Sequence, residues 1–357
     1  MEGAQTQDPI AELITNYNEL NSSVIDELEE EPSPLEFMRY VAKNTPFVVR
    51  GAAADWQANR TWSVEYLKEF LGNETVNVAV TPFGNADAPT PYTHPDGTST
   101  LVFAKPHEED QPFTTFIDYL VSQEHSRPSS EPNTSRTNTI PPNPGRRGGG
   151  GEGEIRYAQT QNDNLRHEYA RLFSHVPPTI PWARIALARD PDAINLWIGN
   201  SHSTTALHKD NYENVYVQVS GQKHFVLLPP VCHPCVKERR LAPGHYERRT
   251  GSTGVKGEEG RLELVMEEGE EEVPFAIWDP DRPRDNATRY SALAQPMRVT
   301  LEPGDMLYLP CMWYHKVSQS CSPEGVCIAV NYWYDMDFSG PLYPLSAFVR
   351  SVSNSQE

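Results

Sequence analysis

Three polar side chains interrupt a stretch that otherwise alternates like two apolar strands, TTALHKDNYENVYVQVSGQKHF at 204–225. His208 and Asp210 are two residues apart, so on one strand they point to the same face. Lys223 follows just beyond a glycine turn. Each of these groups would cost several kcal/mol if it were buried without partners. Their presence therefore predicts a chemical role.

The pair on one strand could bind a metal ion if a third ligand joined it. His315, in PCMWYHKVS, follows a Pro-Gly-Asp turn and lies on a strand that an antiparallel barrel could bring alongside. Two histidines and one carboxylate occupy one side of an octahedral ion and leave positions open, which suits non-haem Fe(II) and oxygen activation. An inward-pointing Lys223 could bind the distal carboxylate of a dicarboxylic cosubstrate. The alternative is a solvated lysine beside a turn.

The elements that would position these residues are short strands separated by turns. After residue 193 they read INLWIGN, TTALHKD, NVYVQVS, KHFVLLPP, MRVTL, MLYLP, WYHKVS and VCIAVNYWYDM. No β-α-β alternation is visible, which favours an antiparallel sandwich or barrel. We predict a mainly β protein with peripheral helices, built on a jelly roll, the double-stranded β-helix of cupin-like proteins.

The first third of the chain mixes helices and strands. Apolar residues recur at helical spacing over 10–28. Ser33-Pro34-Leu35-Glu36 has the form of a capping box and opens a short helix towards Ala42. We expect a strand at 46–50, a helix from Ser63 to Leu71 that ends at Gly72, and a strand from Thr75 to Thr81.

Two polar segments divide the chain. Residues 126–154 are rich in proline, glycine and serine and cannot bury enough surface to offset the entropy of ordering them, so we predict a disordered insertion. A second solvated stretch runs over 248–272. Composition does not decide between two domains and one interrupted domain, and we prefer one. In this single domain we expect the N-terminal segment 1–125 to pack onto a catalytic core at 155–340. The C-terminal segment 341–357 is expected to form a helix and a tail.

Charge and cysteine content limit the function classes. The 357 residues carry a formal charge of −19, which argues against nucleic acid and would attract a cationic protein or peptide, or else simply keeps the protein soluble. No apolar run reaches the about 18 residues of a membrane helix, and the N-terminus lacks the pattern of a signal peptide. Five cysteines do not suggest a disulfide framework. We expect a protein of the cytoplasm, the nucleus or both.

An ordered set of phrases carries a family resemblance: NLWIGN, LHKDNYEN, SGQKHF, MLYLP and CIAVNYWYDM. Together they resemble the JmjC (jumonji-C) 2-oxoglutarate oxygenases of the small protein-hydroxylase type. The resemblance extends from PFVVRGAAADW at 46–56 to VNYWYDMDF at 330–338. It implies Fe(II), 2-oxoglutarate and O₂ as cofactor and cosubstrates. By residue, it assigns His208, Asp210 and His315 to Fe(II), Lys223, Thr205 and Tyr157 to 2-oxoglutarate, Asn214 and Asn331 to its pocket, and Trp333 to a place beside it.

Two of these assignments raise a structural question. Thr205 is three residues before His208, so regular alternation would turn it away, and a twist or bulge is required. Trp333 shares a face with Asn331 but could equally be a core residue.

The resemblance also implies a reaction and a partner. It points to a protein lysyl hydroxylase that acts on small, translation-associated GTP-binding proteins, with 2-oxoglutarate decarboxylated to succinate. Family members often dimerise through terminal helices, so PLYPLSAFVRSVS at 341–353 could form a helix on the barrel or on a second subunit, giving a homodimer.

Three alternatives stay open. A histone lysine demethylase shares the metal chemistry, but no reader domain or cysteine-rich zinc module is visible. The run Cys232-His-Pro-Cys235 is a weak zinc signal, for which a redox or packing role is the better interpretation. A peptidase would leave Fe(II) and 2-oxoglutarate idle. A non-enzymatic cupin-like binding protein would have no need of the complete triad together with Lys223.

Overall fold

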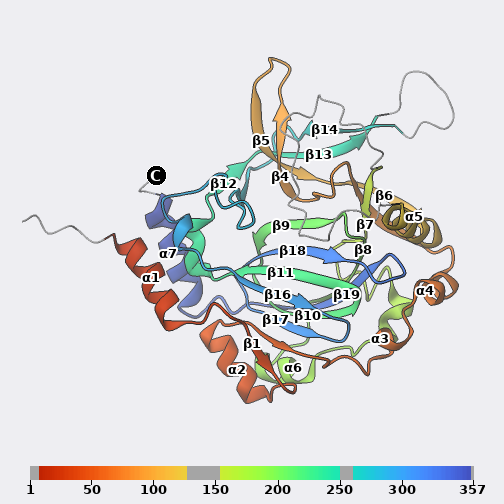
Figure 1. The fold of residues 1–357 in the computed structure, drawn as a ribbon, viewed down its shortest axis with the longest axis horizontal. Helices are drawn as coiled ribbons and strands as arrows, with labels where there is room; N and C mark the ends of the chain where they lie inside the picture. Colours follow the sequence, from red (N-terminus) through yellow and green to blue (C-terminus); the bar gives the residue numbers. More distant parts are fainter. Residues whose placement is uncertain (1–7, 127–152, 250–259, 355–357) are drawn as a thin grey trace, which may run out of the picture.

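Two facing β-sheets form the centre of the molecule (Figure 1). The structure is a computed structural model, and it describes residues 8–126, 153–249 and 260–354, to which all statements below refer. The larger sheet has the order β1 (Asp26–Leu28), β2 (Phe47–Val49), β17 (Met306–Leu309), β10 (Tyr212–Ser220), β19 (Cys327–Asp335) and β8 (Ala193–Gly199). The smaller sheet has the order β16 (Met297–Leu301), β11 (Gln222–Leu228), β18 (Tyr314–Ser320) and β9 (Thr204–Lys209).

Alternation along each strand builds two apolar cores. On β10, Val215 and Val217 face outward into a core that helices cover, whereas Tyr216 faces the smaller sheet. Phe225 of β11 meets Tyr216 there, with ring centroids 5.1 Å apart. This two-sheet packing is the predicted jelly roll.

Gly221 carries the chain from one sheet to the other. β10 pairs with β17 and β19, while β11 pairs with β16 and β18, so the two strands are not a hydrogen-bonded hairpin. The turn instead places β10 and β11 in facing sheets. The side chain of Lys223, on β11, therefore points across the sandwich towards the larger sheet, where Nζ lies 5.9 Å from the ring centroid of Tyr216 on β10.

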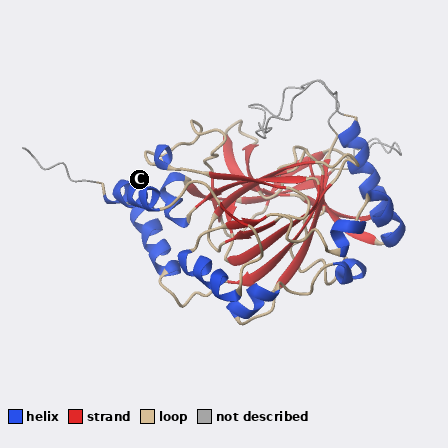
Figure 2. Ribbon diagram, turned by 60° about the horizontal axis from the view of Figure 1, so that its bottom comes forward, coloured by secondary structure: helices blue, strands red, loops and turns tan. Residues whose placement is uncertain are grey.

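Helices cover the outer face of the larger sheet and the edges of the sandwich (Figure 2). They are α2 (Pro34–Lys43), α3 (Gln57–Thr61), α4 (Val64–Leu71), α5 (Phe113–His125), α6 (Pro181–Leu187) and the 3-10 helix η1 (Ala170–His175). Phe37 of α2 packs edge-on against Trp182 of α6 and Tyr308 of β17, at centroid distances of 4.6 and 4.8 Å.

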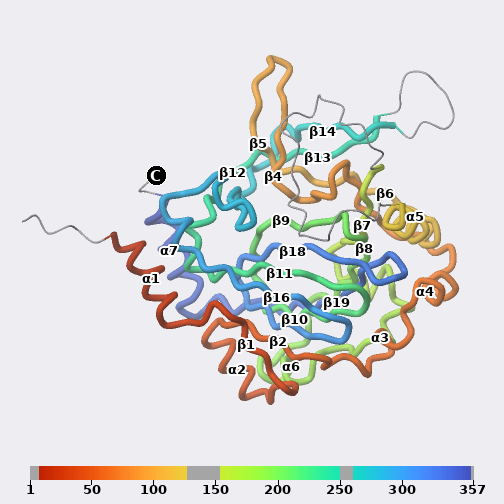
Figure 3. The backbone as a smooth tube through the Cα atoms, in the orientation of Figure 1, coloured from red at the N-terminus to blue at the C-terminus, as the bar shows by residue number. Residues whose placement is uncertain are grey.

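Three small sheets enclose one side of the sandwich (Figure 3). Their strands are β3 (Thr75–Thr81), β6 (His107–Pro112) and β7 (Ile155–Tyr157); β4 (Ala88–Thr93), β5 (Ser99–Lys105), β13 (Pro243–Arg248) and β14 (Leu262–Met266); and β12 (Glu238–Leu241) with β15 (Val273–Ala276). Segments before and after residue 126 thus share these sheets, since β7 pairs with β3, and β13 pairs with β5.

The two terminal helices meet at a third apolar cluster. α1 (Pro9–Leu20) and α7 (Leu342–Asn354) both pack on η2 (Pro230–Cys235), near η3 (Ser291–Leu293). Cys232 and Cys235 are buried in this cluster as free thiols, which agrees with the packing interpretation of that run. Within the described ranges, no helix is both long and apolar enough to cross a membrane.

Several local predictions are confirmed. The capping box at Ser33 and Glu36 is formed, and Gly72 ends α4 with a positive φ of 59°. The strands at 75–81 and 46–50 are also present.

Two predictions are wrong. The helix expected over 10–28 ends at Leu20, because Asn21 caps it in an extended conformation and residues 26–28 pair with β2 instead. The solvated stretch expected over 248–272 contains β14, which pairs with β13, while residues 250–259 lie outside the described part.

Most of the insertion expected at 126–154 also lies outside the described residues. Its last residue is ordered, since the Glu154 carboxylate pairs with Arg248 at 2.7 Å. The disorder predicted for the segment stays a prediction.

The crossover at Gly221 should be intolerant of a side chain. Its φ is +68°, and an added Cβ would come within 2.6 Å of the Ser320 carbonyl oxygen. We expect Gly221→Ala to lower the free energy of unfolding by about 3 kcal/mol or more, from strain and overpacking together. Gly97→Ala is the matched control, because Gly97 also has a positive φ but an open surrounding, and it should cost about 1–2 kcal/mol. Urea unfolding measures both, and equal losses would contradict the argument.

Candidate active site

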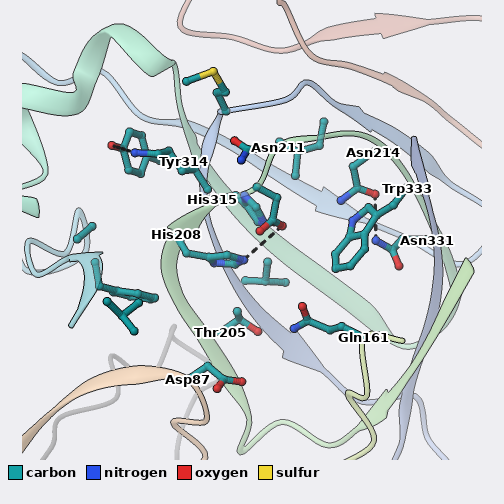
Figure 4. Close-up of a pocket in the computed structure, with 18 of the residues that line it drawn as sticks. Asp87, Gln161, Thr205, His208, Asn211, Asn214, Tyr314, His315, Asn331 and Trp333 are labelled. Carbon is teal, nitrogen blue, oxygen red and sulfur yellow. Dashed lines mark hydrogen bonds and ion pairs between the residues drawn. The ribbon is translucent and has the colours of Figure 1, made fainter. Parts of the chain in front are cut away.

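A cavity of about 740 Å³ opens between the two sheets, and residues from most of the surrounding elements line it. His208 and His315 lie together on its wall (Figure 4), and Asp210 lines the cavity beside them. Lys223, Thr205, Tyr157, Asn214, Asn331 and Trp333 line the same cavity. The structure therefore brings all nine sequence-predicted residues to one place.

Sheet register brings the first and third members of the triad together. β18 pairs with β9 so that His315 lies opposite His208, and their ring centroids are 4.1 Å apart. Asp210 Oδ2 lies 3.7 Å from Nε2 of each imidazole. Two ligands that are each about 2.1 Å from one ion are at most about 4.2 Å apart, so these atoms can share a metal. Within the described residues, this is the one group of three histidine, cysteine or acidic side chains close enough to do so.

Backbone carbonyl groups orient both imidazoles. Nδ1 of His208 is 2.8 Å from the Ala206 carbonyl oxygen, and Nδ1 of His315 is 3.1 Å from the Trp313 carbonyl oxygen. A carbonyl only accepts, so each Nδ1 carries the proton and each Nε2 keeps a free lone pair towards Asp210. The tautomer that a metal requires is thus set by the main chain.

Electrostatics in the triad favour a cation. Burial alone would raise the pKa of Asp210, but the neighbouring imidazoles of His208 and His315 outweigh it and hold that pKa at about 2. Burial, together with the adjacent His208, lowers the pKa of His315 to about 4. The ionised Asp210 and the neutral His315 are in the forms that bind a metal, whereas Asp210 raises the pKa of His208 in spite of its burial, so a proton competes with a metal for that imidazole.

A bulge in β9 turns Thr205 towards the cavity. His208 pairs with His315, and Thr205 pairs with Val317. Thr205 is three positions before His208 on β9, but Val317 is only two positions after His315 on β18, so β9 contains one extra residue here. The extra residue restores Thr205 to the face that carries His208. The bulge that the sequence required is therefore present.

Lys223 lies deep in the cavity with no negative partner among the described residues. Lys223 is only 2% exposed. Its Nζ donates to Tyr157 Oη at 3.0 Å and to Gln319 Oε1 at 2.8 Å. Burial raises the pKa of Tyr157, so both acceptors are neutral. Gly199 permits this arrangement, because a Cβ there would lie 2.3 Å from the Tyr157 ring. An ammonium held by neutral groups in a cavity leaves a place for an anion.

Amide and indole groups complete the inner wall. Asn331 Nδ2 donates to Asn214 Oδ1 at 3.1 Å, and Trp197 Nε1 donates to Asn331 Oδ1 at 2.9 Å. Trp333 stacks on Tyr212, with centroids 4.7 Å apart, and its buried Nε1 has no hydrogen-bond acceptor in the described structure. Trp333 therefore packs on Tyr212 and lines the cavity, and its buried donor is unpaired among the described residues.

Sequence reasoning missed three residues here: Gln319, Trp197 and Asp87. Gln319 is four residues after His315, so alternation along one strand could have found it. Trp197 lies on β8, which reaches the cavity through its pairing with β19. Asp87 carried no signal in the sequence, because it comes from a loop before β4 that only the tertiary fold brings to the cavity.

Comparison with known proteins gives one family and several relatives. Residues 32–340 match the cupin-like domain family. The chain is 37% identical over 314 residues to the human bifunctional peptidase and (3S)-lysyl hydroxylase JMJD7, covering 87% of this chain and 84% of that protein. It is 35% identical over 325 residues to the Arabidopsis thaliana lysine-specific demethylase JMJ32, with 88% and 82% covered. JmjC domain-containing protein E of Dictyostelium discoideum is 29% identical, with 97% of each chain covered.

Removing the central carboxylate should abolish tight metal binding. Loss of a hydrogen bond to a metal ligand typically weakens metal binding by about 10–100-fold. Asp210→Ala removes a ligand itself, so we expect it to weaken Mn(II) binding by more than this. Isothermal titration calorimetry measures the affinity. Asp87→Asn is the control, because Asp87 lines the same cavity outside the triad and its variant should bind Mn(II) as the unmodified protein does. Equal affinity in Asp210→Ala would exclude the triad as the metal site.

Proposed function

The chain belongs to the family of cupin-like JmjC proteins, and from this premise we propose that it is an Fe(II)- and 2-oxoglutarate-dependent oxygenase that hydroxylates a lysine side chain in a protein. The observation that carries the proposal is the shared cavity of the triad and Lys223. One end offers three ligands to a metal, and the other offers an ammonium that no acidic side chain among the described residues pairs with. A small dicarboxylate that also binds the metal would satisfy both ends.

The residues present fit these groups. His208, Asp210 and His315 would hold the iron on one side, leaving the other positions open. Lys223, with Tyr157 and Thr205, would hold the distal carboxylate of 2-oxoglutarate. The bound iron and cosubstrate would together supply the oxidising chemistry that places one oxygen atom of O₂ on a C–H bond and the other in succinate.

The protein's own contribution is orientation and exclusion of water. Main-chain carbonyl groups fix the imidazole tautomers, and the burial of His315 beside the half-buried His208 and Asp210 strengthens the charge interactions of the triad. Tyr157 holds the Lys223 ammonium in one position, so the dicarboxylate would bind in one orientation. The reacting carbon of a substrate would then be set by the cavity wall alone.

Lysine as the target is supported by relatives and by charge. One relative is named for (3S)-lysyl hydroxylation and another for lysine demethylation. A chain with a formal charge of −19 attracts a basic protein surface. We propose translation-associated GTP-binding proteins as the substrate class, as the sequence resemblance implies. The expected homodimer and the cytoplasmic or nuclear location stay predictions.

Lys223 gives an unusual prediction about stability. Lys223→Met should leave the free energy of unfolding of the ligand-free protein unchanged or raised, because it removes a buried ammonium for which the described residues supply no counter-ion. Binding of 2-oxoglutarate should weaken by about 30-fold or more, as for a broken buried charge pair. Urea unfolding and calorimetry give the two quantities.

Lys316→Met is the matched control. Lys316 is also buried, but it pairs with Asp279 and Asp281 at 2.8 Å. This variant should therefore lower stability and keep 2-oxoglutarate binding. If Lys223→Met instead bound 2-oxoglutarate normally, Lys223 would not be the carboxylate partner.

The reaction itself is tested with Fe(II)-loaded protein under controlled oxygen. Lysine peptides from candidate GTP-binding proteins are incubated with 2-oxoglutarate, succinate is measured, and each peptide is examined by mass spectrometry, with Asp210→Ala as control. A gain of one oxygen atom on lysine that requires 2-oxoglutarate supports the proposal. Loss of a methyl group from a methylated lysine would favour a demethylase, and cleavage of the peptide chain would favour a peptidase.

A further inference from the structure

Asp87 is a carboxylate in the cavity that the proposed reaction does not use. We propose that Asp87 receives the ammonium group of the substrate lysine and so selects lysine for hydroxylation. This inference rests on the proposed function and names a specificity-determining residue for it.

The loop that carries Asp87 is fixed against β9. The Thr204 amide donates to the Gly84 carbonyl oxygen at 3.0 Å, next to the bulge that turns Thr205 inward. Gly84 has a φ of +67°, and a Cβ there would meet the His202 carbonyl oxygen at 2.1 Å, so the loop and β9 lie in contact. In Figure 4 the Asp87 side chain faces the same cavity as Thr205 and His208. Main-chain contacts thus fix this loop against β9, and the Asp87 carboxylate lines the same cavity as the triad.

The charge of Asp87 is not neutralised within the described residues. Gln159 Nε2 donates to Oδ2 at 2.9 Å, and Gln159 carries no charge. Two nearby lysines form salt bridges with other carboxylates: Lys105 with Glu267 at 2.7 Å, and Lys209 with Glu238 at 2.9 Å. Burial raises the pKa of Asp87, and the hydrogen bond from Gln159 and the nearby His208 and Lys105 lower it without cancelling that effect. A substrate cation in the cavity would supply the missing charge.

The geometry of the carboxylate favours lysine over arginine. Gln159 already donates to Oδ2, so Oδ1 is the oxygen that accepts no hydrogen bond from the described residues. A guanidinium binds best to both oxygens of a carboxylate, whereas an ammonium is a compact charge that one oxygen can satisfy. A trimethylated lysine has no N–H to donate. Asp87 is therefore suited to unmodified lysine.

Asp87→Asn tests this idea with little disturbance of the fold. Asp87 has a φ of 52°, in the left-handed region that asparagine also tolerates, so the backbone should be kept. The amide keeps the size of the side chain and removes its charge. Binding of 2-oxoglutarate and Mn(II) should be unchanged, because Lys223 and the triad are intact.

The substrate probe is the lysine peptide with the highest turnover in the assay above, and its copies with norleucine, arginine or trimethyllysine at the target position. Unmodified protein should prefer lysine over norleucine by at least about tenfold in kcat/KM, as for a charge-assisted hydrogen bond. In Asp87→Asn the lysine peptide should lose this advantage, mainly through a higher KM. Turnover of the norleucine peptide should not change, because it has no ammonium to lose.

Glu108→Gln is the matched control. Glu108 lines the same cavity but is exposed to solvent, so its charge is screened and its loss should change lysine selectivity by less than about threefold. An equal effect in both variants would indicate a general acidic field and overturn the role of Asp87.

The outcomes separate this inference from the proposed function. If the lysine peptide is hydroxylated but Asp87→Asn slows lysine and norleucine peptides alike, Asp87 is not the ammonium receptor, while the hydroxylase stands. Preference of the unmodified protein for the arginine or trimethyllysine peptide would also overturn the inference. If 2-oxoglutarate binds but no lysine peptide is hydroxylated, the proposed function fails and the inference falls with it.

Discussion

The ammonium group of Lys223 is the constraint around which the inner cavity is built. Burying a charge without a counter-ion is costly, and the protein reduces this cost with two neutral oxygens, from Tyr157 and Gln319. These residues come from β7 and β18, in two different sheets, so satisfying one ammonium requires the small outer sheet to dock on the sandwich. Gly199 of β8 has no side chain in the space that the Tyr157 ring occupies. The jelly roll and its additions therefore meet at this point.

The metal end of the cavity depends on strand register. His208 and His315 are brought together because β9 and β18 pair with these residues opposite each other. A shift by one residue would turn one imidazole to the other face of the sheet, away from the other two members of the triad. The bulge in β9 then lets Thr205 share that face, so one irregularity adds a hydroxyl to the site without disturbing the triad.

The outer part of the cavity has a different origin. Asp87 comes from the loop before β4, Phe275 from β15 and Arg350 from α7, none of which belongs to the two central sheets. The central sheets thus supply the groups suited to a metal and an anion, whereas the surrounding segments form the wall that a substrate would contact. This division allows the outer wall to vary while the inner site is kept.

The sequence by itself determined the groups whose chemistry is local in the chain. His208 and Asp210 share a face because strand side chains alternate, and the capping box at Ser33 is complete within one helical turn. The tertiary structure decided what depends on distant segments: the end of α1, the pairing of β14 with β13, the contact of Gln319 with Lys223 and the arrival of Asp87 in the cavity. Lys223 shows most clearly where local sequence information ends and tertiary contacts decide. Its position after the glycine turn suggested an inward charge, but the lack of a negative partner follows from contacts across three sheets, which no local pattern contains.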